Sequence, residues 1–180
     1  MRRLLLLPVL TLAVATLGIP VAHAGSTSGT FQVLAGGDFG RAPNGDEVMV
    51  TGEGTFSVHP MWVSASGEFT HYNADGSVHA TGTWTATRML SLNFYGCRYI
   101  PRLDVDLGDD SLCGGALKLA VTLDTPLGQL PGILTIFCIV GPSAPAAHGT
   151  EEGEGVTLNV PGVVNFNHTA EGDNIYIRTS

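Results

Sequence analysis

The fold is decided by residues 48–87, which read VMVTGEGTFSVHPMWVSASGEFTHYNADGSVHATGTWTAT. Three runs in this stretch alternate apolar or glycine residues with polar residues, at positions 48–59, 63–70 and 78–87. An alternation with a period of two is typical of β-strands that have one buried and one exposed face. Pro60 and the segment Asn73–Gly76 interrupt the alternation with residues that favour turns. The stretch therefore predicts a meander of three antiparallel strands.

The register of this meander follows if His59–Trp62 and Asn73–Gly76 are both four-residue loops. Gly54 then lies opposite Gly67, and Gly67 lies opposite Gly82. Every apolar side chain falls on one face of the sheet, and large residues lie opposite small ones. A line of glycines allows a sheet to coil sharply, and neighbouring aromatic side chains can cover the gaps. We therefore expect the sheet to close or nearly close on itself.

The rest of the chain carries the same β pattern, and no window has a helical period. Further alternating runs begin near Leu90, Leu117, Val156 and Ile175. Residues 133–140 are apolar on both faces, which predicts a central strand. Segments rich in glycine, proline and acidic residues predict loops at 36–47, 98–112 and 141–153. We predict an all-β fold, an antiparallel up-and-down barrel of about 8–10 strands, with a two-sheet β-sandwich as the alternative.

The N-terminal segment has the pattern of a secretory signal peptide. Arg2 and Arg3 are followed by the apolar run Leu4–Leu17 and by the small-residue site Ala22–Ala24. The run has 14 residues, whereas a spanning helix needs about 20, and no later stretch approaches that length. We predict a signal peptide at 1–24, cleaved before Gly25, and a single secreted β-domain at 25–180 without a membrane span.

The charge of the chain restricts its partners. The formal net charge of −8 becomes −10 once Arg2 and Arg3 are removed with the signal peptide. Nucleic acid and anionic membrane surfaces repel such a protein, so we predict that it binds neither. The polar face of the meander, which carries Glu53, Glu68 and His79, also argues against a barrel whose outer face meets lipid.

Three cysteines in an exported chain predict one disulfide and one free thiol. Cys97 and Cys113 flank one predicted loop, whereas Cys138 lies inside the apolar run at 133–140. A buried free thiol is stable in such a run. We therefore predict the pair Cys97–Cys113, while the two other pairings stay open.

Two groups of residues invite a metal-binding interpretation. In a different register His71 would face His79, but that register would scramble the alternation, and no third ligand has a suitable spacing. The acidic segment Asp104–Asp110 departs from a calcium loop because Gly108 stands at the fifth position, where a ligand belongs. We therefore predict no metal and no cofactor, and interpret the acidic segment as a solvated loop.

No catalytic motif is present in the sequence, such as a glycine-flanked serine nucleophile or a phosphate-binding loop. The leading hypothesis is a non-enzymatic extracellular binding or structural module. Its inward stripe of glycine and alanine leaves room for a small apolar ligand, and a protein partner of unknown identity is also compatible. The alternative is a small-molecule isomerase or cyclase-type enzyme with a barrel-mouth pocket formed by His71, Tyr72 and Glu68.

Overall fold

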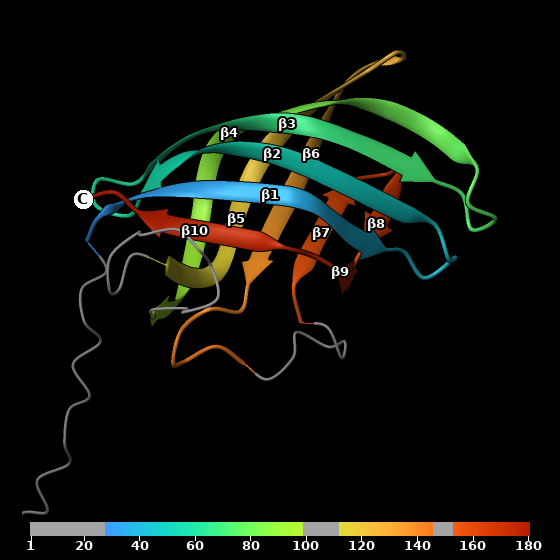
Figure 1. Ribbon diagram of the computed structural model, residues 1–180. Coiled ribbons are helices and arrows are strands. Elements are labelled where there is room, and N and C mark those ends of the chain that lie inside the picture. The colour runs from blue at the N-terminus through green and yellow to red at the C-terminus, as the bar shows by residue number, and fades with distance from the viewer. Residues whose placement is uncertain (1–27, 99–111, 146–152) are drawn as a thin grey trace, which may run out of the picture.

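A computed structural model of the chain describes residues 28–98, 112–145 and 153–180 (Figure 1). The predicted signal peptide at 1–24 and the acidic segment at 104–110 lie outside the described residues. Within the described ranges, no helix is long and apolar enough to cross a membrane.

The described residues form ten strands in one antiparallel sheet and no helix, which confirms the all-β prediction. The strands are β1 (Thr30–Arg41), β2 (Glu47–Ser57), β3 (Trp62–Tyr72), β4 (Val78–Cys97), β5 (Leu112–Thr125), β6 (Gly128–Cys138), β7 (Gly155–Val160), β8 (Val164–Phe166), β9 (His168–Glu171) and β10 (Asn174–Arg178). Strands β1 to β8 pair in chain order. β10 pairs with both β1 and β5, so that six strands close into a ring. The closure is compatible with either predicted architecture, the barrel or the sandwich.

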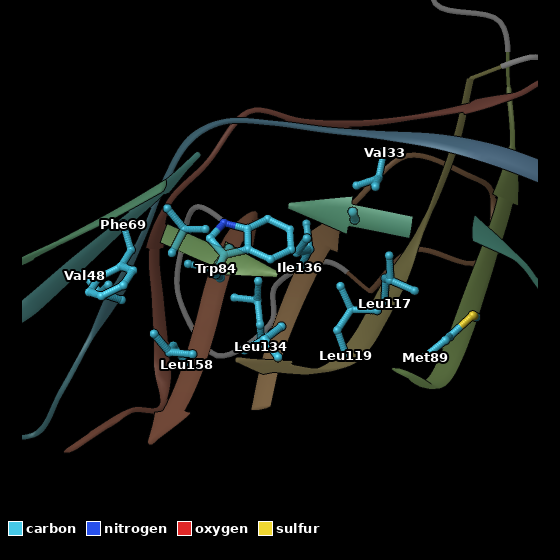
Figure 2. Close-up of a cluster of buried hydrophobic side chains, with 14 of the residues drawn as sticks. Val33, Val48, Phe69, Trp84, Met89, Leu117, Leu119, Leu134, Ile136 and Leu158 are labelled. Carbon is cyan, nitrogen blue, oxygen red and sulfur yellow. The ribbon is translucent and has the colours of Figure 1, made fainter. Parts of the chain in front are cut away.

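The closed sheet encloses one hydrophobic core. Figure 1 shows β1, β2 and β3 arching over β5, β6 and β7, which cross beneath them at a steep angle. β4 is 20 residues long and pairs with both β3 and β5, so it links the two sets of strands. The inward side chains include the buried aromatics Phe31, Phe56, Trp84, Phe166 and Tyr176. Figure 2 shows the indole of Trp84 surrounded by aliphatic side chains of this core.

The predicted register of the meander is wrong by two residues at both hairpins. Gly67 pairs with Gly52 on β2 and with Trp84 on β4, while Gly54 faces Ala65. The reason is the indole of Trp84, which covers the two paired glycines. A Cβ added to Gly52 would lie 2.5 Å from Trp84 Cζ2, and the indole Nε1 donates a hydrogen bond of 2.9 Å to the Thr51 carbonyl. Because a shift of two keeps side chains on the same face, the predicted inward face is still correct.

The prediction of a loop over 36–47 is also wrong, because β1 continues through Gly36 to Arg41. Gly37 is an extra residue that pairs with none on β2, so the strand has a bulge there. Its φ of +126° suits glycine, which has no Cβ. The bulge changes which residues face inward, from Ala35 before it to Asp38 after it.

The cysteines have the predicted arrangement. Cys97 at the end of β4 lies across from Cys113 on β5, and the two form a disulfide. Cys138 at the end of β6 is a free, buried thiol whose Sγ lies 3.4 Å from the Cys113 carbonyl oxygen. Burial raises the pKa of this thiol to about 12, so it stays protonated and unreactive.

Candidate functional site

An apolar pocket of about 760 Å³ opens at one end of the closed sheet. Its polar lining residues are Asn44, Asp46, His71, His79 and Thr125. Its apolar lining residues are Val48, Phe69, Ala80, Leu123, Pro126, Leu127, Leu130, Leu158, Val160, Val163, Val164 and Phe166. Pockets that hold small molecules have volumes of about 300–1,000 Å³ and this same mixture of a mainly apolar wall with a few polar groups.

The core determines where this pocket lies. In the middle of the sheet, Trp84 fills the space above the paired glycines Gly52 and Gly67. Toward the turns, small Ala80 follows on β4, and β7 and β8 contribute aliphatic side chains. The inward glycine stripe is therefore tightly packed, and the open space lies beyond it. A second hollow of about 480 Å³ on the sheet is more open to solvent and has a largely polar lining that includes Gln32, Glu53 and Ser64.

Asp46 and His71 form the polar end of the apolar pocket. His71 Nε2 lies 3.1 Å from Asp46 Oδ2, and the two side chains are only 14% and 18% exposed. Hydrogen bonds from the side chains of Asn44 and His71 lower the pKa of Asp46, so this carboxylate is ionised at neutral pH. In a neutral His71 the proton lies on Nε2, which donates to Asp46, and Nδ1 carries the lone pair.

Two tight turns hold this pair, and both lie at the right-hand end of the sheet in Figure 1. In the β1–β2 turn, the Ala42 amide donates to the Asp46 carbonyl over 2.8 Å, and Gly45 has a φ of +90°. In the β3–β4 turn, the Ala74 amide donates to Asp46 Oδ1 over 3.1 Å. Asp46 therefore ties the two turns together while its second oxygen, Oδ2, contacts His71.

A bulge brings His79 beside His71. Tyr72 pairs with Val78 and His71 pairs with Ala80, which leaves His79 as an extra residue on β4. The two imidazole rings lie 4.6 Å apart, although the side chain of His79 is exposed, as the outward position predicted for it requires. Across the described ranges, no three His, Cys, Asp or Glu residues are grouped so that they could hold a metal ion.

The structure does not bring the three predicted ligand-binding residues together. His71 lines the apolar pocket, where its ring lies nearly perpendicular to that of Phe166 with the ring centroids 5.0 Å apart. Tyr72 stacks on Phe39 instead, with ring centroids 6.5 Å apart. Glu68 is exposed and pairs between Thr51 and Thr83. Sequence reasoning missed Asp46, whose one signal was its place in a turn, two residues before Val48, which pairs with His71.

A second group of polar side chains is buried on the other side of β1. Asp38 is fully buried; its Oδ1 accepts the Asp173 amide over 2.8 Å, and its Oδ2 has no hydrogen-bond partner. Burial, together with the charges of Glu154 and Asp173, raises the pKa of Asp38 to about 7. Asn174 donates from Nδ2 to the carbonyls of Phe137 and Gly155 over 3.0 and 3.3 Å. This group involves four strands, β1, β6, β7 and β10, and lines none of the pockets described above.

The comparisons with known proteins add no further constraint. No protein-family model, no curated protein and no solved structure matches this chain.

Proposed function

We propose that this protein binds a small, mainly apolar molecule in the apolar pocket, with one polar group of the ligand at His71. The proposal rests on the separation of apolar from polar side chains within a pocket of about 760 Å³. Aliphatic walls from β5 to β8 supply the apolar contact, whereas Asp46, His71 and His79 gather at one end. Sites of this kind gain affinity from apolar burial and orientation from a few polar groups.

The charge at the polar end selects among ligands. Asp46 is ionised, and the whole chain is acidic, with a formal net charge of −8. An anionic head group, such as a fatty acid carboxylate, would be repelled by both. Neutral oxygen groups, such as ketones and alcohols, avoid this repulsion and can hydrogen-bond an imidazole. We therefore propose a neutral ligand.

Binding takes place outside the cytoplasm in this proposal. Residues 1–24 serve as a cleaved signal peptide, and residues 25–180 form the secreted domain. The Cys97–Cys113 disulfide is compatible with an oxidising compartment. A mature protein that begins at Gly25 when the chain is expressed with its own N-terminus would support export, and retention of residues 1–24 would contradict it.

A pair of variants on one strand tests the binding site. Ala80 lines the apolar pocket, and its neighbour Thr81 is exposed on the opposite face. We expect Ala80→Phe to fill the pocket and to weaken binding of the neutral dye N-phenyl-1-naphthylamine by about tenfold or more. Thr81→Phe is the matched control and should bind like the unmodified protein.

Fluorescence titration measures the dye affinity, and a melting curve verifies that both variants are folded. Equal affinity of folded Ala80→Phe and Thr81→Phe would contradict the proposed site. A failure of the unmodified protein to bind any neutral dye would contradict the proposed function itself.

A further inference from the structure

We propose that the apolar pocket is also a reaction site, in which His71, oriented by Asp46, removes a proton from a carbon atom of a bound carbonyl compound. The substrate class is a small, neutral, mainly apolar ketone or ester with an acidic C–H bond next to its carbonyl group. This inference rests on the proposed binding function, because the same pocket has to hold the substrate.

The orientation of the imidazole supports the role of a general base. Nε2 of His71 is engaged with Asp46 Oδ2 at 3.1 Å, which leaves Nδ1 as the basic nitrogen of the neutral ring. The ring cannot turn freely, because the edge contact with Phe166 and the neighbouring His79 confine it. A fixed base with a free lone pair is what proton abstraction from carbon requires.

Asp46 is a positioning residue in this proposal, because it acts through His71. The Ala74 amide and the Asn44 side chain hold its carboxylate, and both of these contacts keep it ionised. When His71 takes a proton and becomes an imidazolium, the carboxylate beside it stabilises the new positive charge. The pair therefore places a stabilising negative charge beside the imidazolium that forms during the reaction.

The proposed step balances without any co-reactant. The proton moves from the substrate carbon to His71 Nδ1, and the C–H electron pair becomes the carbon–carbon double bond of an enolate. The carbonyl oxygen takes the negative charge, and His79 is an imidazole donor within reach of the site. When the substrate also has a β,γ double bond, the enolate is conjugated with it. Return of the proton from Nδ1 to the γ-carbon then moves the double bond to the α,β position, so the net reaction is an isomerisation. Tyr72 and Glu68 take no part in it.

The probe for this activity is 5-nitrobenzisoxazole, a flat, neutral molecule. When a base removes its C3 proton, the electron pair forms a nitrile, the N–O bond breaks, and the electrons leave on a coloured phenolate. We expect the unmodified protein to accelerate this reaction, and we expect the rate of His71→Gln to be about 100-fold lower. His168→Gln is the matched control, because His168 is exposed on β9 and outside the pocket.

The pH profile separates a base from a merely structural histidine. The rate should rise with pH through one ionisation, and that ionisation should be absent from His71→Gln. In Asp46→Asn the rate should fall while dye binding is kept, because the imidazolium that forms loses its carboxylate partner. Dye affinity is measured on the same variants.

Retained dye binding together with a lost rate in His71→Gln supports the proposal. Equal rates for the unmodified protein and folded His71→Gln, with dye binding intact, would overturn the role of His71 as the base. The proposed binding function would not be affected. Loss of dye binding in the unmodified protein would overturn both.

Discussion

Two carboxylates on one hairpin, Asp38 and Asp46, have opposite environments. Asp38 lies on β1, is fully buried and has a pKa raised to about 7. Asp46 lies in the β1–β2 turn at the edge of the apolar pocket, where hydrogen bonds from Asn44 and His71 lower its pKa. The same side chain therefore has two states: Asp46 is ionised and hydrogen-bonded to His71 at the pocket, and Asp38 is about half protonated at neutral pH inside the core.

Burial and the number of donors explain the difference. Asp38 accepts one backbone amide, from Asp173, and loses its contact with water. Asp46 receives the Ala74 amide and the side chains of two neighbours while keeping contact with solvent. Donors stabilise the charged form of a carboxyl group, whereas desolvation destabilises it. The comparison predicts that the two groups affect stability and chemistry in opposite ways.

The largest expected effect is a fall in the free energy of unfolding as the pH rises toward the pKa of Asp38. Its pKa is about 7 in the folded protein against 3.8 for an unperturbed group. Since the folded pKa is the higher one, the contribution to stability is complete below about pH 4 and is lost as the pH rises to about 7. The full change is on the order of 4 kcal/mol.

Urea unfolding at several pH values between about 4 and 8 measures this slope. Asp38→Asn should remove most of it, whereas Asp124→Asn, at an exposed position of β5, should leave it unchanged. An identical slope in Asp38→Asn and the unmodified protein would mean that Asp38 is ionised in the core.

An intermediate effect is expected from Asn174, which is buried near Asp38 and bonds to two strands. Asn174→Ala removes two hydrogen bonds and leaves the carbonyls of Phe137 and Gly155 without this donor. We expect a loss of about 2–3 kcal/mol in the free energy of unfolding. Asn165→Ala, at an exposed position of β8, is the control. Equal stability of the two variants would mean that the two hydrogen bonds of Asn174 do not stabilise the fold.

The smallest effect on stability is expected at Asp46. Asp46→Asn should alter the melting temperature least of the three variants, because the carboxylate keeps contact with water. The ring of His71 should respond instead, since the bond that holds its proton on Nε2 is weakened. Nitrogen chemical shifts of labelled histidine measure the two tautomers. An unchanged population of the Nε2–H form would mean that Asp46 does not orient His71.

The alternation of side chains was enough to predict the strands but not their pairing. Residues 48–87 form β2, β3 and the start of β4 with the predicted face inward. The pairing was wrong by two residues because several even shifts satisfy the same alternation. The indole of Trp84 distinguishes between them, since it fits only above the glycines Gly52 and Gly67. That contact joins residues far apart in the chain, so no pattern within a short stretch of the sequence predicts it.

The buried Asp38 and the pairing of His79 with His71 were hidden for a related reason. Bulges at Gly37 and His79 each add one residue, which reverses the side of the sheet to which the following side chains point. Asp38 enters the core through the first bulge, and the second brings His79 to His71. Regular alternation cannot predict a bulge, because the extra residue looks like any other polar or glycine position.

By itself, the sequence determined the all-β class and the buried face of the meander, and it favoured Cys97 and Cys113 for the disulfide. Each of these depends on neighbours in the chain or on the ends of one loop. Only the tertiary structure decided the register, the position of the pocket and the pairing of Asp46 with His71. These depend on which strands meet across the closed sheet, and there the shape of Trp84 and two single-residue bulges outweigh any local preference.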